Sequence, residues 1–195
     1  DPEYVLILSG DQLYRMDYDD MLEAHKRNNA DLTIAVMPVP WEEASRFGIL
    51  TAGEDGRITK FTEKPKKPDS NLASMGIYIF SADVLINSLK EDALDQTSDH
   101  DFGGNIIPKL LEEGKRLFTY EFNGFWRDVG TISSYHETSM DLLGPNPAFD
   151  IFSTTFPIMS NASTRPPAFV GKDGSVDDCL VANGCQIYGT AKHSI

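Results

Sequence analysis

The chain has 195 residues, of which 41% are hydrophobic, and a formal net charge of −13 at pH 7. This size and composition are typical of one globular domain, or of a domain with an appendage. The charge argues against nucleic acid and anionic membranes as partners, because both require basic patches. No apolar run reaches transmembrane length and no signal-peptide pattern opens the chain, so we expect a cytoplasmic protein with no membrane contact.

The first segment, residues 4–11, is a short apolar run that ends in Gly10-Asp11. Apolar runs of this length are typical of buried parallel strands. Asp11 is therefore predicted at the carboxyl end of a central strand, where ligands bind in open α/β sheets and where a carboxylate can hold Mg²⁺. The alternative is that Asp11 caps the following helix.

The next segments alternate between helix and strand patterns. Apolar spacing predicts a helix over 16–29 and a strand over 32–37, which together with the first segment form a βαβ unit and a parallel sheet. The remaining predicted elements are a hairpin (47–51 and 57–62), strands (72–80 and 117–122) and helices (81–90 with Ser81 as cap, 105–113, and 132–143 with Thr131 as cap).

The composition changes after residue 147. Residues 148–175 contain three prolines and no clear periodicity, and they are interpreted as an extended linker. Residues 181–186 then align with 187–192 in a six-residue pattern that is typical of a parallel β-helix, although two repeats can also arise by chance. The predicted organisation is thus an α/β domain with a mixed, mostly parallel sheet over 1–147, the linker, and the first β-helix repeats over 176–195.

Four polar clusters lie at or near predicted strand ends: Gly10-Asp11, Glu63-Lys64-Pro65, Ser74 with Gly76, and Trp126-Arg127-Asp128. Each has a purely structural alternative. Lys64 could be one more surface lysine with Glu63 as its ion-pair partner. Ser74 could start a strand, and Asp128 could pair with Arg127 or cap a turn. Taken singly, these clusters favour the structural alternatives.

In combination, six segments follow one another in an order and spacing that closely resemble the bacterial glucose-1-phosphate adenylyltransferase family. They are residues 10–18, 47–48, 61–65, 74–80, 100–103 and 126–131. The resemblance covers essentially the whole chain. It implies a partial Rossmann-like nucleotidyltransferase domain followed by a left-handed β-helix, and an enzyme that joins ATP and glucose 1-phosphate into ADP-glucose and pyrophosphate for glycogen synthesis. It also implies a homo-oligomer, a tetramer when full length.

The resemblance implies roles for ten residues. Asp11 and Asp128 would be the catalytic aspartates that bind Mg²⁺. Lys64 would bind the phosphate of glucose 1-phosphate and Glu63 the sugar hydroxyls. The remaining positions would line or flank the same site: Gly48, Ser74, Tyr78, Asp101, Phe102 and Trp126.

One family feature has no counterpart, because no glycine-rich, arginine-containing nucleotide loop occurs in the sequence. We therefore expect a segment of a longer protein that is inactive by itself. Two other hypotheses stay open. One is a non-catalytic regulatory paralogue, which the retention of Asp11, Asp128 and Lys64 disfavours. The other is a pyrophosphorylase for another sugar and nucleotide, such as a mannose-1-phosphate guanylyltransferase.

Overall fold

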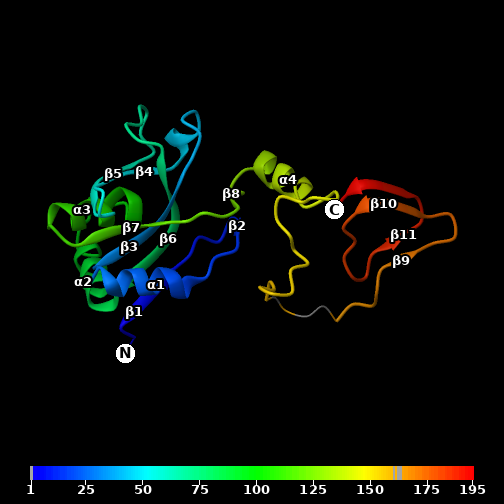
Figure 1. The fold of residues 1–195 in the computed structure, drawn as a ribbon, viewed down its shortest axis with the longest axis horizontal. Helices are drawn as coiled ribbons and strands as arrows, with labels where there is room; N and C mark the ends of the chain where they lie inside the picture. Colours follow the sequence, from blue (N-terminus) through cyan, green and yellow to red (C-terminus); the bar gives the residue numbers. More distant parts are fainter. Residues whose placement is uncertain (1, 160, 162–163) are drawn as a thin grey trace. The chain divides into compact units, whose positions relative to one another are not determined.

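The computed structural model describes residues 2–159, 161 and 164–195. The chain divides into two compact units (Figure 1). The first contains Asp1–Gly10 and Met16–Gly124, and the second contains Asp11–Arg15 and Phe125–Ile195. Within the described ranges, no helix combines the length and apolarity needed to cross a membrane.

The first unit is built on a six-stranded sheet with the order β5-β4-β6-β3-β7, in which β1 also pairs with β6. Its strands are β1 (Tyr4–Ile7), β3 (Leu32–Pro38), β4 (Gly48–Ala52), β5 (Ile58–Glu63), β6 (Leu72–Ser81) and β7 (Leu117–Glu121). Strand β3 runs parallel to β7, whereas β1–β6, β3–β6, β4–β5 and β4–β6 are antiparallel. The prediction of a mostly parallel sheet is therefore wrong, because hydrophobic runs reveal strands but not the direction of their partners.

The first strand also differs from its prediction. Strand β1 pairs with β6 rather than lying at the centre of a parallel sheet. Leu6 and Leu8 are 39% and 44% exposed, so this run is half-buried rather than buried. Strands β1 and β3 both pair antiparallel with β6 and so share a direction, but β6 lies between them.

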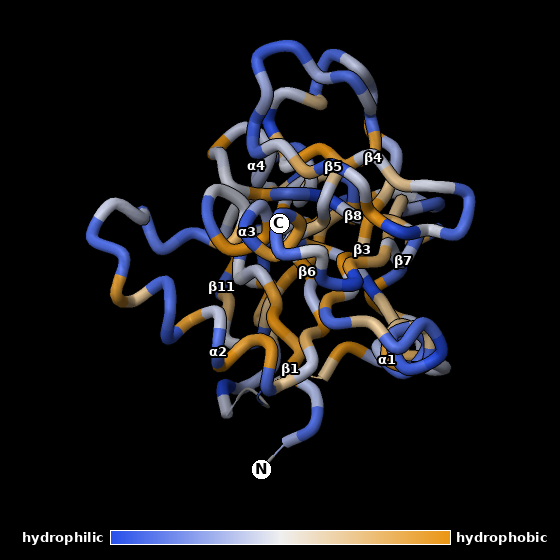
Figure 2. Tube along the Cα trace, turned by 90° about the vertical axis from the view of Figure 1, so that its left-hand side faces the viewer, coloured by the Kyte–Doolittle hydropathy of each residue, from blue (hydrophilic) through white to orange (hydrophobic). Residues whose placement is uncertain are grey.

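Helices cover both faces of this sheet, which explains why nearly every side chain of β3 is buried. Leu32, Ile34 and Val36 belong to one core cluster, together with residues of α2 (Ala82–Asp92) and α3 (Ile107–Glu112). On the other face, Thr33 contacts α1 (Tyr18–Arg27). Figure 2 shows the hydrophobic colour concentrated on the strands and the hydrophilic colour on the outer loops. Two short turns complete the unit, the 3-10 turn η1 (Ala44–Arg46) and the π turn η2 (Phe102–Ile106).

The second unit begins with a small antiparallel ribbon of β2 (Gln12–Tyr14) and β8 (Trp126–Asp128). Helix α4 (Ile132–Met140) follows, and Thr131 forms a capping box with Ser134, which confirms Thr131 as its cap.

The C-terminal strands of this unit form two parallel pairs. Strand β10 (Ser175–Cys179) pairs with β12 (Thr190–Ser194), and β9 (Phe169–Val170) pairs with β11 (Gln186–Ile187). Parallel pairing between short strands close in sequence is compatible with a β-helix, but two pairs do not establish one. The left-handed β-helix therefore stays a prediction.

Candidate active site

Seven of the ten predicted site residues belong to the first unit, on strands β4, β5 and β6, directly after β5, and on or beside the π turn η2. They are Gly48, Glu63, Lys64, Ser74, Tyr78, Asp101 and Phe102. Asp11, Trp126 and Asp128 belong to the second unit.

The carboxylate of Glu63 lies in a notch made by two glycines. Glu63 is the last residue of β5 and faces Gly48 in β4. A β-carbon on Gly48 would approach Glu63 Oε2 to 2.9 Å, and one on Gly103 would approach Glu63 Cδ to 2.9 Å. Real β-carbons essentially never come so close, so both positions require glycine if Glu63 is to keep this orientation. Sequence reasoning selected Gly48 but missed Gly103, whose only signal was its place in the His100–Gly103 motif.

Lys64 follows directly and has an unusual backbone. Its φ is +42°, in the left-handed region that residues with a side chain rarely adopt. Its backbone N–H donates to Phe47 O at 3.1 Å, and its Nζ lies 3.4 Å from Glu63 Oε1. The ion pair of the structural alternative is thus present, but an exposed pair contributes little stability and does not explain the backbone. Such conformations cluster at functional sites.

Ser74 and Tyr78 form the next part of the cluster, both on β6. Ser74 is 8% exposed and is the third residue of β6, so the alternative that it starts a strand is wrong. Its hydroxyl accepts from the N–H of Gly76 at 3.2 Å and is hydrogen-bonded to Tyr78. Burial raises the pKa of Tyr78, and the charges of Glu63 and Asp101 add to that effect. The Tyr78 hydroxyl therefore stays protonated and able to donate.

Asp101 and Phe102 open the π turn. Asp101 is its N-cap, and Oδ1 accepts from the N–H of Gly104 at 2.6 Å. The ring of Phe102 lies 5.8 Å from the ring centroids of both Tyr78 and Phe80. The turn is thereby fixed against β6, and Gly103 is fixed against Glu63.

In the second unit, Asp11 and Asp128 come together across the β2–β8 ribbon. Gln12 faces Asp128 in the ladder, and the N–H of Val129 donates to Asp11 O at 2.9 Å. The position of a β-carbon on Gly130 lies 3.3 Å from Asp11 Oδ2 and 3.5 Å from Asp128 Oδ1. Both carboxylates thus approach one point. The alternative that Asp11 caps α1 is wrong, because Asp17 is the cap and its Oδ1 accepts from the N–H of Asp19.

Two carboxylates suit Mg²⁺, which usually takes one or two protein carboxylates and completes its shell with water and substrate oxygens. Across the residues that the structure describes, no group of three or more His, Cys, Asp or Glu side chains is arranged to hold a metal. The two aspartate carboxylates match the number that Mg²⁺ usually takes from a protein.

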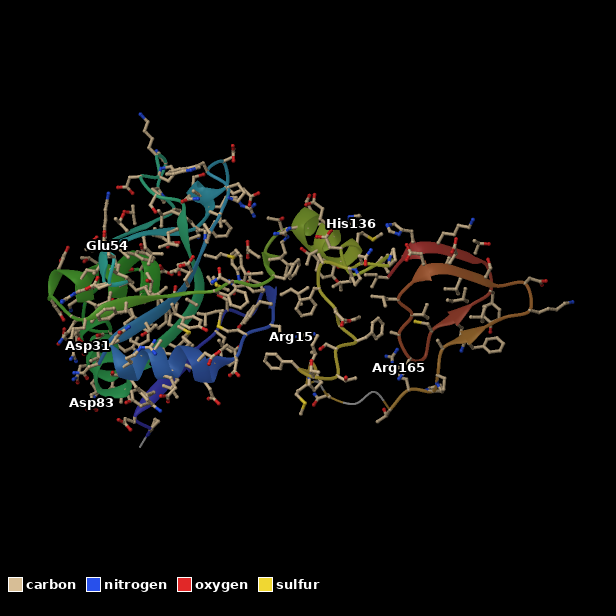
Figure 3. All side chains as sticks on the ribbon, viewed as in Figure 1. Arg15, Asp31, Glu54, Asp83, His136 and Arg165 are labelled. Carbon is tan, nitrogen blue, oxygen red and sulfur yellow. The ribbon has the colours of Figure 1, made fainter. Side chains whose placement is uncertain are left out.

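Two further residues, Trp126 and Arg15, lie on or beside the ribbon that carries this pair. Trp126, the first residue of β8, is 6% exposed. Arg15, labelled in Figure 3, lies just after β2. Its guanidinium stacks 4.8 Å from the ring centroid of Phe149 and donates to Asp150 O. Sequence reasoning did not select Arg15, which holds the segment after α4 to the ribbon.

Comparison with known proteins defines the class first. The nucleotidyl transferase family model matches residues 1–144, so the chain belongs to the nucleotidyl transferase family. Three curated relatives are all glucose-1-phosphate adenylyltransferases: from Acetivibrio thermocellus (51% identical), Clostridium perfringens (52%) and Bacillus subtilis (53%). They match 100% of this chain but only 46%, 50% and 51% of their own lengths. The chain thus spans about half the length of these relatives. Membership of the nucleotidyl transferase family is thereby shown, and the resemblance to glucose-1-phosphate adenylyltransferases that the motifs indicated is confirmed by relatives of that name.

Proposed function

We propose that this chain supplies the glucose 1-phosphate site and the metal-binding aspartates of an enzyme that makes ADP-glucose and pyrophosphate from ATP and glucose 1-phosphate. The observation that carries the proposal is the Glu63-Lys64 pair, with its carboxylate held between two glycines and its lysine in a left-handed backbone. Relatives that are about half identical and carry the adenylyltransferase name support it.

In this proposal Lys64 binds the phosphate through its positive charge, because its side chain is 67% exposed and its pair with Glu63 is a surface pair that a ligand can replace. The Glu63 carboxylate, 32% exposed, accepts hydrogen bonds from sugar hydroxyls. Ser74 and Tyr78 supply further polar contacts, and Gly48 leaves the room that the sugar and Glu63 need. Asp101 and Phe102 flank the site, and the family resemblance gives Trp126 the same role.

The chemistry needs no general base, since the nucleophile is already an oxyanion. An oxygen of glucose 1-phosphate attacks the α-phosphorus of ATP, and the bond to the bridging oxygen breaks as pyrophosphate leaves. The difficulty is repulsion between two anionic substrates, which the charge of Lys64 reduces. Asp11 and Asp128 would hold Mg²⁺, which when bound neutralises charge on the nucleotide phosphates.

The domain plan is part of the same proposal. Residues 1–147 would be part of the catalytic domain, 148–175 a connector and 176–195 the start of a left-handed β-helix. The parallel pairing of β10 with β12 supports the last assignment, and the pairing of β11 with β9 extends the same pattern into the connector range. The same family resemblance supports a tetrameric assembly and a cytoplasmic location for the full-length enzyme.

The test is steady-state kinetics on an active full-length enzyme that contains this chain. Lys64→Ala should raise the KM for glucose 1-phosphate by roughly one to two decades, the cost of a lost charge-assisted contact, and leave the KM for ATP nearly unchanged. Lys66→Ala is the matched control, because it removes an exposed lysine two residues away. An unchanged KM for glucose 1-phosphate in the Lys64 variant would remove the basis of the proposal.

A further inference from the structure

A closed ring of hydrogen bonds lies directly before the π turn and outside the residues assigned to substrate. Asp92, the last residue of α2, is 8% exposed. Its Oδ1 accepts from Ser98 Oγ at 2.6 Å, and its Oδ2 lies 2.7 Å from His100 Nδ1. The N–H of His100 donates in turn to Ser98 Oγ at 3.0 Å. Three residues are thereby tied into one unit.

The geometry determines which atoms of this hydrogen-bonded ring carry hydrogens. An ionised carboxylate only accepts hydrogen bonds, so His100 Nδ1 carries the hydrogen. The hydrogen bonds from Ser98 and then His100 lower the pKa of Asp92. The carboxylate is therefore charged at neutral pH and can act as a fixed double acceptor.

The ring fixes an unfavourable backbone. His100 has a φ of +57°, in the left-handed region that non-glycine residues rarely adopt. Rarely populated conformations persist only where the surroundings impose them. Here both the side chain and the backbone N–H of His100 are held, the first by Asp92 and the second by Ser98.

The direction in which the chain leaves His100 sets the π turn. The next residue, Asp101, accepts backbone hydrogen bonds from Asn105 and Ile106 on its carbonyl oxygen, at 3.0 and 3.2 Å. Its side chain caps Gly104. Rotation at His100 would therefore move the whole turn, including Gly103, which forms one wall of the Glu63 notch.

From these contacts we propose that Asp92 is a positioning residue for the sugar-binding part of the site. Through Ser98 and His100, it holds the backbone that sets Gly103 against Glu63 and Phe102 against Tyr78. Asp92 touches no substrate in this scheme. The inference rests on the proposed function, since it concerns the same glucose 1-phosphate site.

The first test compares Asp92→Ala with wild type in the full-length enzyme. Asp92→Ala should raise the KM for glucose 1-phosphate about tenfold, the usual effect of losing hydrogen bonds to a charged group, with the KM for ATP nearly unchanged. Asp95→Ala is the matched control, because the Asp95 carboxylate lies in the same loop but accepts from Thr97 instead. Unfolding midpoints of all variants should be measured, so that kinetics are compared at a temperature where each is folded.

The second test separates backbone control from a general loss of structure. Both His100→Ala and His100→Gly remove the imidazole that donates to Asp92, but only glycine adopts a positive φ freely. His100→Ala should therefore raise the KM for glucose 1-phosphate as Asp92→Ala does, whereas the KM of His100→Gly should stay near that of the wild type. In addition, His100→Gly should restore much of the loss when combined with Asp92→Ala. Equal effects of alanine and glycine at position 100 would overturn the inference.

The outcomes also distinguish this inference from the function on which it rests. If Lys64→Ala raises the KM for glucose 1-phosphate but Asp92→Ala does not, the proposed function survives and the positioning role of Asp92 fails. If the wild-type enzyme does not use glucose 1-phosphate, both fail together.

Discussion

The substitution Gly103→Ala tests whether the Glu63 notch binds the sugar. The added β-carbon would lie 2.9 Å from Glu63 Cδ and closer still to Oε2, whereas ordinary contacts begin at 3.4 Å. The carboxylate must retreat by about 1 Å, a displacement that can cost up to two decades in an active site. Because the carboxylate ends a flexible side chain and Gly103 does not have a positive φ, the stability should change by only about 0.5 kcal/mol.

The assay is steady-state kinetics together with thermal unfolding of the full-length enzyme. Gly103→Ala should raise the KM for glucose 1-phosphate by roughly one to two decades while the Tm stays near wild type. Gly189→Ala is the matched control, because no atom lies within 4 Å of a β-carbon there. If Gly103→Ala leaves the KM for glucose 1-phosphate unchanged, the Glu63 carboxylate is not where the sugar binds.

Gly48→Ala should behave differently from Gly103→Ala, because its β-carbon also meets the ring of Phe61 at 2.5 Å. Overpacking this core ring should cost roughly 1–3 kcal/mol, which thermal unfolding would register as a fall in Tm of several degrees. Asp11→Asn should lower kcat strongly with little change in Tm, and its effect with Asp128→Asn should be less than additive if both act through one ion. Asp17→Ala should instead cost about 1 kcal/mol of stability and leave kcat unchanged, since Asp17 is the cap of α1. Burial lowers the pKa of His25 from 6.5 to about 4, so the unfolded state binds more protons between these values. Stability should therefore fall as pH drops, by roughly 2 kcal/mol between pH 7.5 and 5, and denaturant titrations of His25→Gln should lack this slope.

The position of most elements could be predicted from the sequence because hydrophobic periodicity and capping residues are local signals. Thr131 is an example, since its capping box depends on a residue only three positions away. Ser81 shows the limit of the same reasoning. It occupies the N-cap position of α2 but makes no capping bond, and its hydroxyl donates to Ala30 O instead. The Ser81 hydroxyl thus bonds to a residue distant in sequence and not to the first turn of its own helix, and no local sequence pattern indicates this preference.

The sheet shows a second limit. Strand β1 and strand β3 have similar apolar runs, yet β3 is covered on both faces and β1 is half exposed. A run of apolar residues indicates that burial is favourable, but the extent of burial depends on the elements that pack against each strand. Gly103 was missed for a related reason, because its contact with Glu63 joins residues that are distant in sequence.

The prediction that the two aspartates meet assumed a parallel sheet, whereas they meet across an antiparallel ribbon. The antiparallel ribbon requires one particular register of the two strands. A parallel sheet would bring strand ends to a common edge, whereas here an antiparallel ribbon pairs Gln12 with Asp128. A slip of one residue in this register would turn Asp128 to the opposite face. The bond from Val129 N–H to Asp11 O lies just beyond the ladder and opposes such a slip, and Gly130 leaves open the space that both carboxylates face. The unit that places these carboxylates is therefore not two isolated aspartates. It is two short segments, Asp11-Gln12 and Asp128-Val129-Gly130, whose backbone pairing determines where the carboxylates meet.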